Sequence, residues 1–274
     1  MTKLIRKPNG GDGHLHAVTP KSVKSDCPNW DYVGFDLYRL KTGETLAAET
    51  KTREQILVII EGKMNASAGG KSFGELGGRM DIFSKEKAYA LYVPNDSGWE
   101  ISATTDLELA VCSAPGKSGH DVRVIAPDGK AMEERGKGAN TRFVNPICME
   151  ENDWADSLLV TEVWTPNGNW SSYPSHKHDH DNYPIETYLE ETYYHRLAPA
   201  DGWAVQRVFN DDLSMDETMS IYNRDLVLVP EGYHPCAAPY GYEMYYLNVM
   251  AGPLRNWRFQ NHPDHNWIYE RDAG

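Results

Sequence analysis

The sequence is poor in cysteine, in basic residues and in long apolar runs, and each shortage excludes a class of protein. Four cysteines in 274 residues, with no Cys-x-x-Cys pair, exclude a disulfide scaffold and favour a reducing, cytoplasmic setting. No apolar run approaches the roughly 18 residues of a membrane-spanning helix, and the cationic N-terminal residues are followed by no apolar stretch of the secretory type. Asp and Glu outnumber Lys and Arg by 40 to 27, and the formal charge of −13 argues against nucleic-acid and anionic-membrane partners.

Long amphipathic helical patterns are also absent, and short β-branched or alternating runs take their place. These runs end at Gly, Pro or Asn, which are the residues that commonly form the turns between strands. Runs of this length and spacing predict an all-β fold of antiparallel sandwiches or barrels. The expected strands cover residues 55–60, 88–93, 107–112, 122–125, 158–164, 226–229 and 245–250.

The two halves of the chain look like weak copies of each other. ILVIIEGKM is followed by LYVPNDSGW in the first half, and LEETYYHRL by LVLVPEGYHP in the second. A repeat this long indicates duplication of a whole domain. The polar stretch at residues 115–140 is the expected junction, so we predict domains at 1–125 and 126–274.

The histidines are unevenly distributed, with four of ten between residues 176 and 195. His176 and His178 are one residue apart, so on a strand both imidazoles leave the same face while Lys177 points the other way. Two imidazoles placed like this can chelate one metal ion. The His14-Leu15-His16 pair has the same spacing but lies in a Gly-rich segment, and we expect it to be idle.

Further potential ligands follow the histidine pair. Glu190 and Glu191 precede a strand-like run, and His234 follows an apolar strand in PEGYH. Three nitrogens and one carboxylate oxygen suit Zn, Mn, Fe or Ni, with a coordination position left for substrate or water. The first half has no His between His16 and His120, and Trp99 stands where the second half has His234, so we expect no such site there.

H-x-H, then Glu, then P-x-G-x-H resembles the metal motifs of the cupin superfamily. The segment LVTEVWTPNGNWSSYPSHKHD at 159–179, with LEETYYHR and VPEGYHP, is similar to the KduI/IolB family of bacterial uronate isomerases, and the resemblance extends from Tyr38 to Trp257. It implies a bicupin, two tandem double-stranded β-helix (jelly-roll) barrels, with a metal-free N-terminal cupin and the active site in the C-terminal one. It also implies a divalent metal, zinc before Mn, Fe or Ni, and allows a homo-oligomer.

The carboxylate ligand needs a choice, because twelve residues separate His178 from Glu191 where the cupin motif has only a few. The related isomerases carry an E-x-Y-[FY] pattern after this insertion, and Glu191-Thr192-Tyr193-Tyr194 matches it. The resemblance therefore assigns the metal to His176, His178, Glu191 and His234, with Glu190 and Glu186 as alternative carboxylates. By strand alternation Glu191, Tyr193 and His195 then face the barrel interior.

The reaction implied by the resemblance is aldose–ketose isomerisation of 5-deoxy-D-glucuronate to 5-dehydro-2-deoxy-D-gluconate in myo-inositol catabolism. His195 is the first candidate for the base because the unperturbed pKa of His lies near neutrality; Tyr193 and Glu190 are the other catalytic candidates, and a hydride shift is the alternative route. Candidates for binding substrate are Arg142, Tyr246 and Lys177, with Arg142 preferred over Arg196, Arg255 and Arg258 for the carboxylate. The competing functions are an Fe-dependent dioxygenase and a non-catalytic sugar-binding cupin.

Overall fold

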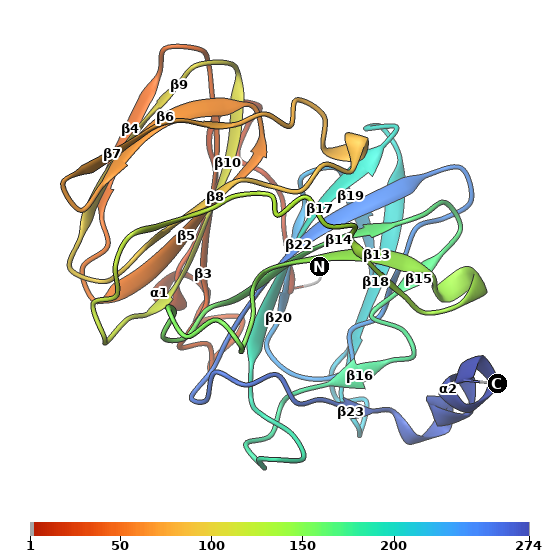
Figure 1. Cartoon of the computed structure of the whole chain (residues 1–274). Coiled ribbons are helices and arrows are strands. Elements are labelled where there is room, and N and C mark those ends of the chain that lie inside the picture. Colours follow the sequence, from red (N-terminus) through yellow and green to blue (C-terminus); the bar gives the residue numbers. More distant parts are fainter. Residues whose placement is uncertain (1–2, 274) are drawn as a thin grey trace.

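The computed structural model describes residues 3–273, and nearly all of its regular elements are antiparallel β-strands. Two double-layered β structures lie side by side, one formed by the red-to-yellow first half of the chain and one by the green-to-blue second half (Figure 1). This arrangement confirms the predicted all-β fold with two tandem barrels. In the described part of the chain, no helix is long and apolar enough to cross a membrane.

The first barrel consists of a six-stranded sheet, in the order β11-β8-β5-β10-β3-β2, and a four-stranded sheet, in the order β4-β9-β6-β7. Its interior is filled by apolar side chains such as Leu57, Met64, Trp99 and Leu109. Its strands are β2 (Gly13–Val18), β3 (Gly34–Leu40), β4 (Thr45–Glu49), β5 (Arg53–Glu61), β6 (Lys63–Ala68), β7 (Lys71–Gly77), β8 (Ala90–Val93), β9 (Gly98–Ala103), β10 (Leu107–Pro115) and β11 (Arg123–Ile125), with the short helix α1 (Pro20–Val23) and the 3-10 turn η1 (Ile82–Ser84).

The second barrel consists of a seven-stranded sheet, in the order β1-β20-β17-β22-β14-β13-β12, facing a four-stranded sheet, in the order β15-β21-β18-β19, with the pair β16-β23 beside them. The helix α2 (Asn266–Ala273) ends the described chain after the 3-10 turn η3 (Pro263–His265), and η2 (Gly138–Asn140) connects β12 to β13. The strands are β1 (Ile5–Arg6), β12 (Glu133–Arg135), β13 (Arg142–Cys148), β14 (Leu159–Thr165), β15 (Trp170–Ser171), β16 (His176–Lys177), β17 (Glu190–Ala198), β18 (Trp203–Phe209), β19 (Asp216–Tyr222), β20 (Leu226–Val229), β21 (Cys236–Ala237), β22 (Glu243–Ala251) and β23 (Gln260–Asn261).

The seven runs expected to be strands all coincide with or overlap strands of the structure, namely β5, β8, β10, β11, β14, β20 and β22. Their continuous apolar character has a structural reason. The larger sheets of the two barrels pack on each other, and one core cluster joins residues of both halves, among them Ile56, Val58, Tyr245 and Leu247. These central strands are therefore buried on both faces, whereas β18 and β19 alternate because one of their faces meets solvent.

The boundary between residues 125 and 126 stays a prediction. β11 ends at Ile125 and pairs with β8, while β12 begins at Glu133 and pairs with β13. The short strand β1 pairs with β20, so residues 5–6 extend the larger sheet of the second barrel.

Buried carboxylates connect the two barrels. Glu162 of β14 accepts hydrogen bonds from Arg79 and from the backbone N–H of Ala88, at 2.9 and 3.0 Å. Glu54 of β5 reaches the other way and accepts from the backbone N–H groups of residues 156–158. Each of these carboxylates is fully shielded from solvent and satisfied by donors of the opposite half, which buried charge requires.

Candidate metal centre

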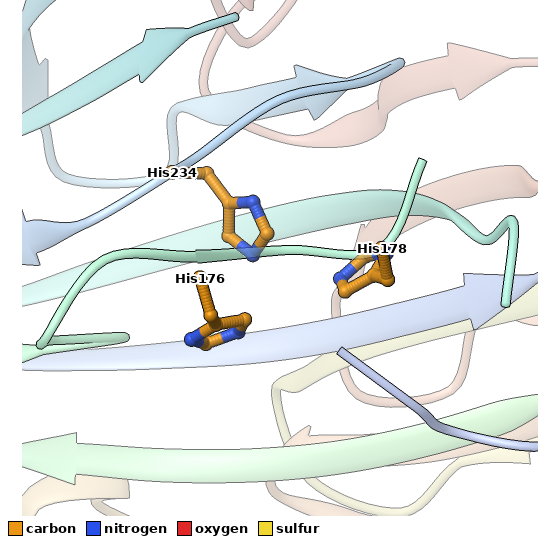
Figure 2. Close-up of side chains that lie close together, drawn as sticks. All are labelled: His176, His178 and His234. Atoms are coloured by element: carbon orange, nitrogen blue, oxygen red, sulfur yellow. The ribbon is translucent and has the colours of Figure 1, made fainter. Parts of the chain in front are cut away.

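Three imidazoles from separate parts of the second barrel converge at one point. His176 lies on β16, His178 follows that strand, and His234 lies in the loop between β20 and β21. One ligand nitrogen from each lies within 4.8 Å of the others, and the rings surround a common space (Figure 2). All three side chains are buried, so the protein has already removed the water that would compete for these nitrogens.

The hydrogen bonds of two of these rings determine where their lone pairs lie. Nδ1 of His178 is 3.0 Å from the carbonyl oxygen of Leu189, and Nδ1 of His234 is 2.8 Å from that of Gly232. A carbonyl can only accept, so each Nδ1 carries the hydrogen and each neutral ring keeps its lone pair on Nε2. The two carbonyl groups fix the orientation of the rings, as the hydrogen-bond partners of metal-bound histidines commonly do.

Glu191 of β17 approaches two of the three imidazoles. Its Oε2 lies 3.2 Å from Nε2 of His178 and 3.1 Å from Nε2 of His234. Nε2 of His234 is buried without a hydrogen-bond partner, in spite of that short distance. At these distances a carboxylate oxygen is held either by a proton on the imidazole nitrogen or by a cation that both groups bind. Two imidazole nitrogens beside an ionised carboxylate are a donor set that fits a divalent metal ion.

The two contacts of Glu191 have the spacing of neighbouring ligands on a common first-row ion. Ligand atoms about 2.1 Å from a metal, at angles between octahedral and tetrahedral values, lie about 3.0–3.4 Å apart. The two Glu191 distances fall in this range. The amide of Asn248 donates to the other carboxylate oxygen of Glu191 and fixes the carboxylate plane.

The protonation states suit metal binding at neutral pH. Burial acts to raise the pKa of Glu191, but the neighbouring His234 and His178 lower it to about 2, so the carboxylate is ionised. Burial lowers the pKa of His176 well below its ordinary value and keeps that ring neutral. Burial acts to lower the pKa of His178 as well, but its hydrogen bond to Glu191 raises the pKa above its ordinary value, so a metal ion that binds this ring displaces a proton.

The two alternative carboxylates lie elsewhere. Glu186 accepts from the backbone N–H groups of Asp179 and His180 in the inserted loop, at 2.8 and 3.2 Å. Glu190 faces the first barrel, where its carboxylate accepts from the backbone N–H groups of residues 31–33. Burial raises the pKa of Glu190 to about 7, against the effect of these hydrogen bonds. Of the three glutamates, the structure brings Glu191 to the imidazoles.

A small cavity of about 40 Å³ opens beside His176 and Glu191. Tyr193 and Tyr246 line it, and each phenol hydroxyl is hydrogen-bonded to a serine: Tyr193 to Ser172 at 2.8 Å and Tyr246 to Ser171 at 2.6 Å. Ser172 has φ of +50°, a left-handed conformation that is strained for Ser and is often found at functional positions.

The other predicted site residues differ in how close they come to this cavity. Arg142 lines it. His195 is fully buried and does not line the cavity. Its Nε2 lies 3.1 Å from the side-chain oxygen of Gln206, and burial lowers the pKa of His195 to about 4. Lys177 points away, into ion pairs with Asp179 and Asp211.

Sequence reasoning missed three polar residues of the centre: Ser171, Ser172 and Asn248. The two serines stand inside the long motif that carries the family resemblance, so the signal for them was present. Asn248 lies in the middle of an apolar strand, YYLNVM. A single amide in such a run is the feature that could have pointed to a polar role inside the barrel.

Comparison with known structures defines the class of protein. Oxalate decarboxylase of Bacillus subtilis has a TM-score of 0.62 and 12% identity, and the match covers 100% of this chain and 85% of that chain. A likeness at this identity shows the fold alone, which is that of a bicupin. The protein is thus a bicupin whose second barrel carries a convergent His–carboxylate set.

The family follows from closer matches. The model of the KduI/IolB family matches residues 4–268, and the chain belongs to this family. A solved IolB-like protein from Salmonella typhimurium is similar with a TM-score of 0.93 and 47% identity, covering 97% of this chain and 99% of that one. The 5-deoxy-glucuronate isomerase of Geobacillus kaustophilus is 52% identical over 98% of this chain and 96% of its own length; that of Bacillus subtilis is 41% identical over 99% and 100%. The predicted family is confirmed.

We expect the purified chain to bind one divalent ion tightly, and the variants Glu191→Gln and His234→Ala to lose that binding, because each removes a donor from the set. At an ion concentration of 100 times Kd, binding stabilises the fold by about 2.7 kcal/mol, which appears as a rise in Tm. Metal analysis and thermal unfolding with and without chelator measure both effects. His14→Ala is the matched control outside the centre. Undiminished metal affinity in His234→Ala would remove that residue from the site.

We also expect His195 to make stability depend on acid pH. Its folded-state pKa of about 4 lies below the ordinary 6.5, so between these values the unfolded chain binds a proton that the folded chain does not. Stability therefore falls as the pH is lowered from 6.5 to 4, by roughly 3 kcal/mol from this residue. Urea unfolding of the wild type and of His195→Gln at pH 7 and pH 4.5 isolates the contribution. Parallel losses in both proteins would contradict it.

Proposed function

We propose that this isomerase converts 5-deoxy-D-glucuronate into 5-dehydro-2-deoxy-D-gluconate at the centre formed by His176, His178, Glu191 and His234. The family match over nearly the whole chain supports the reaction class. The observation that carries the location is the buried carboxylate of Glu191 held against the Nε2 atoms of two imidazoles. Zinc is the first candidate ion, with Mn, Fe and Ni as alternatives, and myo-inositol catabolism in the cytoplasm is the proposed context.

The reaction requires two transfers. One hydrogen moves from C2 to C1 of the sugar, and one proton moves from the C2 hydroxyl to the C1 oxygen. A divalent metal bound at the centre would supply Lewis-acid stabilisation of the negative charge that develops on these oxygens. The remaining work falls to side chains that line the cavity.

We assign the proton transfer between the two sugar oxygens to Ser172 and Tyr193. Their hydroxyls are 2.8 Å apart, so a proton accepted by one can be matched by a proton donated from the other. Burial raises the pKa of Tyr193 well above its ordinary value, so the phenol stays protonated at neutral pH. A concerted relay leaves no charge on either hydroxyl.

We assign the transfer of the carbon-bound hydrogen to a direct hydride shift from C2 to C1. Its electron pair travels with the hydrogen, C2 becomes the carbonyl carbon, and C1 becomes the hydroxymethyl carbon. This route needs no separate base at C2. Such a base was predicted at His195, Tyr193 or Glu190, but His195 and Glu190 do not line the cavity and Tyr193 is a protonated phenol.

The experiment that tests the function is an assay of the metal-loaded protein on C2-deuterated 5-deoxy-D-glucuronate. We expect the ketose product with deuterium retained at C1, detected by NMR. Exchange of the deuterium with solvent would replace the hydride shift with a proton-transfer route. Oxygen consumption would favour the dioxygenase, and absence of turnover on any uronate would favour the sugar-binding cupin.

Replacement of Tyr193 by Phe should lower kcat by about 10²- to 10⁴-fold, because the relay loses one hydroxyl and general acid–base catalysis contributes about this much. Metal content should not change, since the phenol is not a ligand. Tyr222→Phe, on an exposed part of β19, is the control. Full activity of Tyr193→Phe would exclude the phenol from the proton transfer.

A further inference from the structure

The hairpin formed by β12 and β13 brings two guanidinium groups to one wall of the cavity. Arg135 and Arg142 are directly opposite each other across the ladder, and both line the cavity that holds His176 and Glu191. Like charges directly opposite in a sheet are destabilising. This pair therefore needs an explanation beyond strand formation.

The partners of these arginines leave positive charge at the cavity. Within the described residues, Arg142 has no carboxylate within ion-pair distance; its Nη1 donates to the carbonyl oxygen of Asn140 at 3.1 Å and lies 3.5 Å from that of Tyr173. Arg135 contacts the half-exposed Glu133 on its own strand, and its guanidinium carbon is 6.0 Å from the ring centre of Trp257, another cavity residue. In a chain with a formal charge of −13, an unpaired Arg at a cavity indicates an anion from outside.

The other candidate arginines are already occupied. Arg196 faces the junction between the barrels and pairs with Glu108 at 2.7 Å. Arg258 pairs with Glu150, and Arg255 donates to backbone carbonyls. Arg142 is thus the candidate whose guanidinium faces the cavity without a competing carboxylate.

The backbone of the hairpin is shaped around the Arg142 side chain. Gly136, directly after β12, has φ of +81°, and a Cβ at this position would lie 2.7 Å from Nη1 of Arg142 and 2.1 Å from the carbonyl oxygen of Asn140. No side chain fits there without moving that guanidinium or the backbone. The glycine allows the chain to turn closely around Arg142.

The hairpin lies several strands away from the strand that carries Glu191. In the larger sheet β13 is three strands from β17, which carries Glu191, a separation of about 14 Å at about 4.8 Å per strand. Side chains from both strands reach into the space between. A six-carbon uronate has its carboxylate at the end opposite to C1 and C2, so with the reacting carbons at the metal centre the carboxylate points towards the hairpin.

We propose that Arg142, assisted by Arg135, is the carboxylate-recognition site that selects uronates over neutral sugars. The proposal rests on the proposed function and concerns the end of the substrate opposite to the reacting carbons. The planar guanidinium of Arg142 binds the carboxylate oxygens, as Arg does at such sites. Arg135 adds a second positive charge to the cavity lining, where the substrate carboxylate competes with the exposed Glu133 for its guanidinium.

The test compares a uronate with its neutral counterpart. Arg142→Gln, Arg135→Gln and the control Arg207→Gln are assayed in metal-loaded form on 5-deoxy-D-glucuronate and on 5-deoxy-D-glucose. Arg207 pairs with Asp216 on the outer sheet, away from the cavity. We expect kcat/KM for the uronate to fall about 10²-fold in Arg142→Gln and about tenfold in Arg135→Gln, with little change for the neutral sugar. Equal losses on both sugars, or no loss, would overturn the proposal.

Calorimetric binding of D-glucuronate and D-glucose to the same metal-loaded proteins separates this proposal from the proposed function. Preference of the wild type for the acid, lost in Arg142→Gln and reduced in Arg142→Lys, supports the recognition site even if no turnover is found. Equal binding of the acid by wild type and Arg142→Gln contradicts it. Metal content and Tm of each variant show that the centre and the fold are intact.

Discussion

The organisation of the second barrel depends on one electrostatic constraint: a buried carboxylate faces the Nε2 atoms of two imidazoles. Glu191 is ionised at neutral pH, and each ring directs Nε2 at its Oε2 while Nδ1 donates to a backbone carbonyl. The arrangement is favourable when a proton or a metal ion lies between the carboxylate and the rings. Loop carbonyls from residues 189 and 232 and the amide of Asn248 hold the acceptors in place, so much of the polar interior serves this one interaction.

The first barrel contributes by fixing the outer face of the strand that carries the centre. On β17 consecutive residues point in opposite directions: Glu190 binds backbone N–H groups of residues 31–33, and Glu191 turns inward to the imidazoles. Tyr194 and Arg196 likewise reach Glu108 of the first barrel. The apolar interior of the first barrel therefore supports the chemistry without taking part in it.

Much of this architecture could be predicted from the sequence, because local patterns express it directly. Apolar runs located seven strands, and alternation along β17 separated the inward Tyr193 from the outward Tyr194. The sequence could not show how far each inward side chain lies from the cavity. His195 has the chemistry of a base, but it does not line the cavity. The position of a residue along the barrel axis depends on how the sheets curve and stagger. The partners of Lys177 were hidden for a similar reason, since Asp211 comes from a distant hairpin loop. The strained Ser172 and the opposition of Arg135 and Arg142 are properties of the folded backbone.

The strand pair β16–β23 has a consequence for the shape of the cavity. The cavity of about 40 Å³ is small for a six-carbon acid, so the positions of its wall residues decide what fits. Trp257 belongs to that wall, and three residues later the same segment pairs with His176 and Lys177 through Gln260 and Asn261. One short segment therefore supplies both a wall of the cavity and the strand partner of His176, so the shape of the cavity and the position of that imidazole depend on the same stretch of chain.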